Sequence, residues 1–223
     1  MGKLEVFNKL LHKKGALLQC IFSTLIFQTL TTIVVFRYIY QNPKSNLNIF
    51  HENSIINILI FLFIQFALLY AMIAVDISFA MRFVLFIVFS IVQGLLLGAG
   101  MVHVNRDVIM SALVSTLAIF VIFLGLGIFI VYLGIDLGWM GVYLLFGLLG
   151  VIIVNITNMI IKPGDTTSKY TTVFGMLLFS IFILYDTNNI LLKYGESKIF
   201  CIRGALDYYL DIINLFTQAI DIN

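Results

Sequence analysis

Charged residues are scarce in this chain. Of its 223 residues, 13 are Lys or Arg and 11 are Asp or Glu, which together make 11% of the sequence. Soluble domains usually carry about 25% charged residues. The hydrophobic fraction is 61% and the mean hydropathy is +1.09, so the composition excludes a soluble domain and predicts an integral membrane protein. The net charge of only +2 indicates no general affinity for nucleic acid.

Cysteine and histidine are also rare. Cys20 lies in an apolar run and Cys201 in a polar segment, so the two make neither a disulfide framework nor a metal-binding set. We interpret both as packing or loop residues. The three histidines, His12, His51 and His103, are scattered and lack the spacing of zinc ligands. We therefore expect no bound cofactor and no enzymatic activity.

Apolar runs of about 20 residues, long enough to cross a bilayer as helices, fill most of the chain. Six are clear, at residues 16–36, 55–75, 83–102, 112–133, 139–161 and 172–192. A seventh, at 202–222, is less apolar because Asp207, Asp211 and Asn214 interrupt it. The sequence predicts an all-α integral membrane protein, in which residues 1–223 form a single transmembrane domain built as a seven-helix bundle. Polar side chains cannot face lipid, so we expect the seventh segment to be central; a re-entrant path for it is an alternative.

The distribution of positive charge predicts the orientation of the chain. With seven crossings and a cytoplasmic N-terminus, eight Lys and Arg residues fall on the cytoplasmic side and five on the other side. Cytoplasmic segments of membrane proteins are enriched in these residues, so the N-terminus is predicted to be cytoplasmic. The lysine-rich start resembles a signal peptide, but the apolar run after it is too long. We interpret that run as a retained first helix, and a re-entrant last segment would return the C-terminus to the cytoplasm.

Small residues recur at a spacing that lets helices approach closely. Gly94 and Gly98 are four residues apart in the third apolar run, and Gly147 and Gly150 lie in the fifth. Such spacing favours helix packing in membranes. We expect these contacts to lie within one molecule rather than between two.

Three acids lie inside apolar segments, where a charge is costly and usually marks a pathway or a paired site. The connection between the last two segments is centred near Lys198, so that Asp186 lies 12 residues before it and Asp211 lies 13 residues after it. In an antiparallel helical hairpin these two carboxyl groups lie at nearly the same depth. Asp207 lies one helical turn from Asp211, about 6 Å along the axis. The sequence therefore predicts an Asp186–Asp211 pair, with Asp207 on the way to it.

Two adjacent carboxyl groups in a low-dielectric interior cannot both ionise cheaply, so they tend to share a proton. Loss of that proton leaves two repelling charges that attract water or a hard cation, and carboxylate oxygens suit Ca²⁺. The predicted site is a proton-sensitive cation pathway or gate, with Asp186 and Asp211 as candidate calcium ligands. The alternative is that each acid only packs, hydrogen-bonded to Tyr185, Thr187, Asn188 or a backbone carbonyl.

Several stretches resemble one known family. "FSIFILYDTNNI" and "ALDYYLDIINLF" look like the C-terminal signature of the Bax-inhibitor-motif family (lifeguard and Golgi anti-apoptotic protein-like). "LLQCIFSTLIFQTLTTIVV" is similar to its first helix and "FIVFSIVQGLLLG" to its third. The resemblance implies a seven-helix fold, a pH-sensitive calcium leak from the endoplasmic reticulum or Golgi, and suppression of apoptosis. The functional acids of the family fall on Asp186 and Asp211.

The chain also departs from the family pattern. Gln93 stands where many relatives have a glutamate before glycine, and Arg82 stands alone where some relatives have an arginine cluster. In those relatives the cluster can latch the aspartate pair, so Arg82 is a candidate latch; the alternative is an interface anchor whose stem follows the apolar surface.

Two other functions compete with a calcium leak. The first is a non-conducting membrane protein whose partners are cell-death regulators, other channels or a second copy of itself. The second is an intramembrane aspartyl protease, but the nearest match to its second motif, "LGID" at residues 133–136, precedes the Tyr-Asp of the sixth run and lacks the first glycine. For a calcium leak, the expected partners of the protein are the lipid bilayer, calcium ions and protons.

Overall fold

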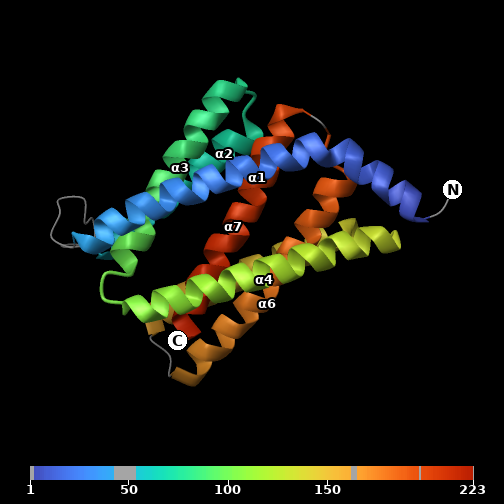
Figure 1. Cartoon of the computed structure of the whole chain (residues 1–223). Coiled ribbons are helices and arrows are strands. Elements are labelled where there is room, and N and C mark those ends of the chain that lie inside the picture. Colours follow the sequence, from blue (N-terminus) through green and yellow to red (C-terminus); the bar gives the residue numbers. More distant parts are fainter. Residues whose placement is uncertain (1–2, 43–53, 162–164, 196, 223) are drawn as a thin grey trace. The chain divides into compact units, whose positions relative to one another are not determined.

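The computed structural model describes residues 3–42, 54–161, 165–195 and 197–222. Within them the chain forms seven α-helices and one short 3-10 helix, and it contains no strand (Figure 1). The elements are α1 (Lys3–Gln41), α2 (Ser54–Ala74), α3 (Phe79–Gly100), α4 (Arg106–Leu133), η1 (Gly138–Met140), α5 (Gly141–Ile161), α6 (Asp165–Leu192) and α7 (Lys198–Ile222). The predicted all-α membrane fold is confirmed.

Each of the seven predicted segments corresponds to a helix, but most of the helices extend beyond the apolar runs. The Ser78 side chain accepts a hydrogen bond from the Met81 N–H before α3, and the Asn105 side chain accepts one from the Asp107 N–H before α4. Such caps satisfy backbone donors that a helix start leaves unpaired. A helix therefore begins at its polar cap, whereas an apolar run begins only where the hydrophobic residues start.

The first helix is far longer than the predicted first segment. It has 39 residues, a length of about 58 Å at 1.5 Å per residue, whereas the hydrocarbon core of a bilayer measures about 30 Å. The extra length comes from the lysine-rich start. The ring of Phe7 packs edge-on against Tyr132 at the end of α4, with ring centroids 5.4 Å apart, so this polar start belongs to the folded structure.

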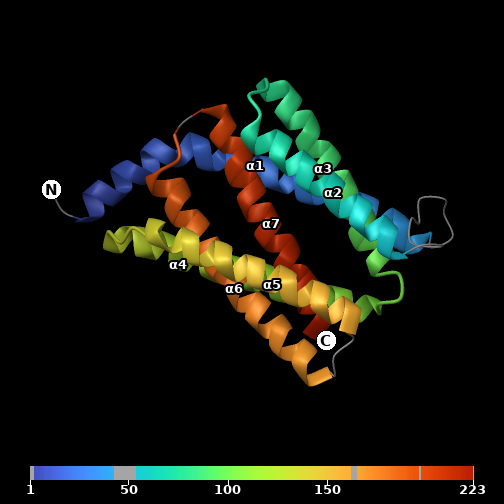
Figure 2. The ribbon, with the colours of Figure 1, turned by 180° about the vertical axis from the view of Figure 1, so that it is seen from behind.

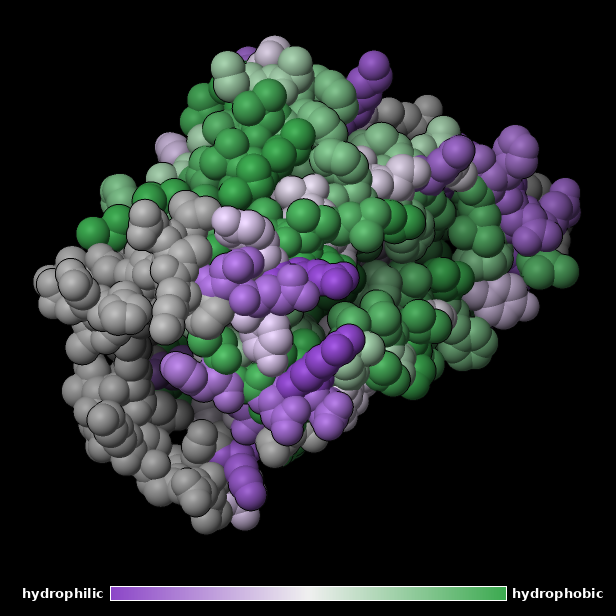
Figure 3. All heavy atoms as spheres, turned by 60° about the vertical axis from the view of Figure 1, so that its left-hand side comes forward, coloured by the Kyte–Doolittle hydropathy of each residue, from purple (hydrophilic) through white to green (hydrophobic). Residues whose placement is uncertain are grey.

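Five helices are long and apolar enough to cross a membrane, when the described residues are judged by length and composition. They are Lys3–Gln41, Phe79–Gly100, Arg106–Leu133, Gly138–Asn155 and Lys169–Leu192. The described apolar part of α2, Ile60–Ala74, is shorter. Figure 3 shows one face, on which hydrophobic residues form broad areas and hydrophilic residues gather in separate patches. The chain is therefore a multi-pass membrane protein.

The chain divides into two compact units. The first contains Met1–Ala16, Asn105–Glu196 and Asp207–Asn223, and the second contains Leu17–Val104 and Ser197–Leu206. The long helices α1 and α7 therefore each contribute to both units. The single transmembrane domain predicted for the whole chain stays a prediction.

Glycines bring helices together within each unit. A Cβ added at Gly94 of α3 would lie 2.8 Å from the carbonyl oxygen of Thr32 on α1, and one added at Gly98 would lie 2.8 Å from the Cβ of Ile39. In the first unit, a Cβ at Gly147 of α5 would lie 2.8 Å from a methyl carbon of Leu178 on α6. No described atom outside its own helix lies within 4 Å of a Cβ built at Gly150. Gly94, Gly98 and Gly147 are thus packing glycines within the molecule, as predicted.

Helix α7 buries one broad face in each of the two units. Ala205, Leu206, Tyr208 and Tyr209 are each at most 1% exposed. These four side chains lie on one side of the helix, whereas Asp207, Leu210 and Asn214 on the other side are only half-buried. The seventh segment is thus extensively buried, and its central position in the bundle stays a prediction.

Candidate functional site

The structure brings the two predicted acids together in the first unit. Asp186 projects from α6 and Asp211 from α7, and the two side chains lie close enough to interact. Asp211 is 4% exposed, whereas Asp186 is half-buried. Two carboxyl groups can hydrogen-bond to each other only if one of them carries a proton. A shared proton between Asp186 and Asp211, and a role for the pair as a cation pathway or pH gate, stay predictions.

One carboxyl oxygen of the two acids is buried and left without a hydrogen bond within the described residues. This oxygen is the Oδ2 atom of Asp211. A buried acceptor that is left unsatisfied costs about 1–3 kcal/mol. A proton, a water molecule or a cation that reached this oxygen would remove that cost.

Most of the polar neighbours of Asp186 bond elsewhere. The hydroxyl of Thr187 donates to the Ile183 carbonyl at 2.7 Å and shares a 2.9 Å hydrogen bond with the hydroxyl of Tyr208. The Asn188 side chain accepts from the Leu137 N–H at 3.0 Å and donates to the Ile135 carbonyl at 2.8 Å. Asn188 thus fixes the connection between α4 and η1. These contacts weaken the alternative in which Thr187 and Asn188 serve mainly to hold the acids.

Asp207 lies one turn from Asp211 and interacts with it electrostatically. It is half-buried, and the hydroxyl of Tyr194 donates a 2.5 Å hydrogen bond to its Oδ2. Asp207 therefore lies between the pair and the connection that joins α6 to α7, as predicted, but one of its oxygens is already occupied by a phenol.

Sequence reasoning missed Tyr208, which lies between Asp207 and Asp211 on the neighbouring face of α7. It is fully buried, and its ring packs edge-on against Phe120 of α4 with centroids 5.4 Å apart. A tyrosine inside an apolar segment is ordinarily taken for packing. Its hydroxyl, bonded to Thr187 beside Asp186, makes Tyr208 a polar contact between α6 and α7.

Arg82 and Gln93 belong to the second unit. Arg82 is 6% exposed, and its Nη2 donates a 3.2 Å hydrogen bond to the Val75 carbonyl oxygen. The side-chain amide of Gln65 on α2 donates to the Gln93 side-chain oxygen on α3. Gln93 thus joins α2 and α3. The role of Arg82 as a latch stays a prediction.

The donor set for a metal ion is small. In the described ranges, no group of three or more His, Cys, Asp and Glu residues is arranged to hold one. Calcium takes six to eight oxygen ligands, so the two carboxyl groups would supply only part of its shell. Hydroxyls, backbone carbonyls and water would supply the rest.

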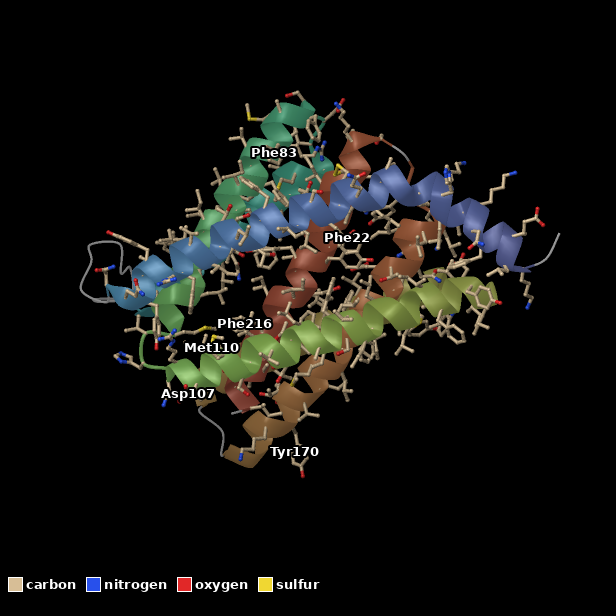
Figure 4. The ribbon with its side chains drawn as sticks, in the orientation of Figure 1. Phe22, Phe83, Asp107, Met110, Tyr170 and Phe216 are labelled. Carbon is tan, nitrogen blue, oxygen red and sulfur yellow. A yellow bond between two sulfur atoms is a disulfide. The ribbon has the colours of Figure 1, made fainter. Side chains whose placement is uncertain are left out.

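The interpretation of the two cysteines as packing or loop residues is wrong. Cys20 of α1 and Cys201 of α7 form a disulfide, with their Cα atoms 5.7 Å apart (Figure 4). Cys201 also contacts the hydroxyl of Thr24 at 3.5 Å. Counting cysteines could not show that two residues 181 positions apart meet. The available signal was that both lie a few residues past the lysines that precede the first and last segments.

The described residues define a multi-pass helical membrane protein with paired carboxyl groups in a buried polar region. The chain belongs to the family described as inhibitor of apoptosis-promoting Bax1, whose profile matches residues 15–222. The resemblance drawn from the sequence motifs is thereby confirmed.

Individual relatives show how much of the chain is shared. Bax inhibitor 1 of Schizosaccharomyces pombe is 28% identical over 160 residues, which are 72% of this chain and 58% of that protein. The Golgi anti-apoptotic protein of vaccinia virus strain Lister is 25% identical over 219 residues, which are 98% of this chain and 89% of the viral protein. An uncharacterized protein of Borreliella burgdorferi is 27% identical over 192 residues, which are 82% of this chain and 80% of that protein. The match therefore spans less than two thirds of the fission-yeast protein and most of the viral one.

Proposed function

We propose that this protein is a pH-sensitive calcium leak channel of intracellular membranes that regulates calcium stores and inhibits apoptosis. The observation that carries the proposal is the interaction between the Asp186 and Asp211 side chains in the first unit, where the Oδ2 atom of Asp211 is buried. Membership of the Bax-inhibitor family supports the link to apoptosis. The names of the yeast and vaccinia relatives point the same way.

The proposed gate works through the shared proton. With the proton in place, a hydrogen bond between the two acids holds α6 and α7 together and the pair carries a single negative charge. When the proton leaves, two negative charges lie close together and repel strongly in a medium of low dielectric constant. The two helices then separate or admit water, and the four carboxylate oxygens become ligands for Ca²⁺. Rising pH on the accessible side therefore opens the pathway.

The proposed location is the endoplasmic reticulum or Golgi, with the N-terminus in the cytoplasm. The name of the viral relative supports the Golgi, and the excess of Lys and Arg on the N-terminal side supports the orientation. We propose no enzymatic activity and no resident cofactor, because calcium is the transported ion in this mechanism.

The test is calcium flux into liposomes that hold the purified protein, measured across pH. Asp186→Asn and Asp211→Asn should each remove most of the pH dependence, since either change abolishes the charge repulsion and half of the cation site. The double variant should be little worse than either single one, because groups that act as a unit are not additive. Asp207→Asn should shift the pH midpoint and leave flux measurable. Asp107→Asn, at the exposed start of α4 (Figure 4), is the matched control and should change nothing.

Two results would count against the channel. Independent, additive effects of Asp186→Asn and Asp211→Asn would mean that the carboxyl groups do not act as a pair. Liposomes that show no flux at any pH, with folded protein in them, would favour the second candidate, a non-conducting protein that acts on cell-death regulators, on other channels or through self-association.

A further inference from the structure

Lys14 is buried although its neighbours in the sequence are not. It is 7% exposed, whereas Lys9 and Lys13 on the same part of α1 are exposed. Lysine is almost never fully buried unless it is paired. The Lys14 ammonium group donates a hydrogen bond to the backbone carbonyl of Tyr194, which lies just after the end of α6. A cation is favourable there because carbonyl groups at a helix C-terminus carry partial negative charge.

Tyr194 is held at both its backbone and its side chain. Its N–H and that of Lys193 donate to the Asn189 carbonyl at 3.0 and 2.7 Å, which closes the last turn of α6. Its carbonyl accepts from Lys14, and its hydroxyl donates to Asp207 at the start of the second half of α7. One residue thus connects the start of α1, the end of α6 and α7. The beginning of α1 and this end of α6 lie side by side in both ribbon views (Figure 1 and Figure 2).

The start of α1 has a second attachment in the same unit. The ring contact between Phe7 and Tyr132 of α4 fixes the helix two turns before Lys14. This contact anchors α1 on the N-terminal side of Lys14. The groups then follow in order from the end of α6 inward: Lys14, Tyr194, Asp207, Asp211 and Asp186.

We propose that Lys14 and Tyr194 form a clasp that closes the end of the aspartate pathway beside the α6–α7 connection. The buried ammonium group repels cations that approach this end, and the Tyr194 phenol occupies the oxygen of Asp207 that would first meet them. Opening the pathway then requires the start of α1 to release Tyr194. The clasp deepens the proposed function and rests on it, since a gate has a purpose only if ions pass the aspartates.

A purely structural role for Lys14 is the competing explanation. A lysine that only caps α6 would affect stability and leave conduction unchanged. Charge and hydrogen bonding can be separated at this position. Lys14→Gln keeps a donor for the Tyr194 carbonyl but removes the charge, and Lys14→Arg keeps both. Lys13→Met, one residue away and exposed, controls for loss of a lysine, and Tyr170→Phe, 74% exposed near the start of α6 (Figure 4), controls for loss of a phenol.

The experiment measures calcium flux in liposomes for the whole chain at a pH where wild type is nearly closed. Lys14→Gln should increase flux by roughly fivefold to tenfold because one charge facing a divalent ion is removed. Tyr194→Phe should increase it by roughly twofold to fivefold because one hydrogen bond to a charged group is lost. Lys14→Arg, Lys13→Met and Tyr170→Phe should match wild type. Acetylation of the wild-type protein by a water-soluble reagent, read by mass spectrometry, should modify Lys13 and Lys9 well before Lys14.

The outcomes separate the clasp from the channel. If wild type conducts and Lys14→Gln conducts no more, the clasp is wrong and the channel stands. If Lys14 is acetylated as fast as Lys13, the clasp is also wrong. If wild type is silent but Lys14→Gln conducts, both proposals are supported, because the clasp then holds the resting channel closed. If neither conducts, the channel fails and the clasp fails with it as a gate.

Discussion

Helices α5 and α7 distribute their residues in opposite ways. In α5 the large apolar and aromatic side chains point outward: Tyr143 is 69% exposed and Phe146 is 67% exposed. In α7 the tyrosines Tyr208 and Tyr209 are fully buried, and Asp211 is only 4% exposed. A lipid-facing helix needs an apolar surface, whereas a polar side chain needs partners that lipid cannot offer. The more polar of the two helices is therefore the one in the core.

Replacing one tyrosine in each helix tests this difference directly. The replacement in α7 should have the largest effect on stability. Tyr208→Ala would leave a cavity beside Phe120 and remove the hydrogen bond to Thr187, so we expect it to lower the free energy of unfolding by about 3–5 kcal/mol. Tyr143→Ala on α5 should change it by less than about 0.5 kcal/mol. Unfolding in detergent, followed by circular dichroism, measures both. Equal losses for the two variants would refute the contrast between α5 and α7.

Sequence reasoning located the helices and the acid pair for physical reasons that can be named. Apolar runs reveal membrane helices because lipid demands an apolar surface. The depth of Asp186 and Asp211 followed from their nearly equal distances to Lys198, because a helical hairpin keeps such positions level. Helix ends were less accurate, since the caps Ser78 and Asn105 are polar and lie outside the apolar runs.

The contacts that were missed join parts that are distant in the sequence. Lys14 looked like one of several tail lysines that set the orientation, and only the fold shows that it reaches Tyr194. Cys20 and Cys201 looked like isolated residues until α1 and α7 were placed together. Periodicity and composition describe each helix by itself, so they carry no information about which side chains of two helices meet.

The disulfide lies at the start of α7, and its loss should have the second-largest effect on stability. By closing a loop of about 180 residues it restricts the unfolded chain, so Cys20→Ser should lower the free energy of unfolding by about 2–4 kcal/mol. The predicted orientation places both cysteines near the cytoplasmic ends of their helices, where thiols are normally kept reduced. Because reduction breaks the Cys20–Cys201 bond, reductant should destabilise wild type to the level of Cys20→Ser.

Mass tagging with a maleimide checks the bond itself. Purified wild type without reductant should take up no tag, whereas Cys20→Ser should take up one, on Cys201. Cys201→Ser is the matched control and should behave in the same way with the tag on Cys20. Two tags on unreduced, folded wild type would contradict the disulfide, and unchanged stability after reduction would mean that it contributes little to the fold.

The smallest effect is expected where an acid lies outside the polar core. Asp136, in the connection between α4 and η1, is exposed, accepts a 2.7 Å hydrogen bond from the Gly138 N–H and lies 3.2 Å from the Lys193 ammonium nitrogen. The Gly138 hydrogen bond and then Lys193 hold the Asp136 pKa below its usual value. A carboxyl whose folded-state pKa is lowered stabilises the fold above its unfolded pKa of about 3.9, and this contribution is lost as the pH falls through the folded pKa.

Exposed ion pairs contribute little because water screens them, so Asp136→Asn should lower the melting temperature only slightly at pH 7. The difference between wild type and this variant should shrink further as the pH falls below about 4 and passes through the lowered pKa of the folded-state carboxyl. Melting curves in detergent from pH 3 to 7 measure this, with Asp107→Asn as the control for an exposed acid at a helix start. A loss as large as that of Tyr208→Ala would show that the Asp136–Lys193 pair is a structural element of the same rank as the buried face of α7. The stability of the protein would then depend as much on its exposed connections as on its polar core.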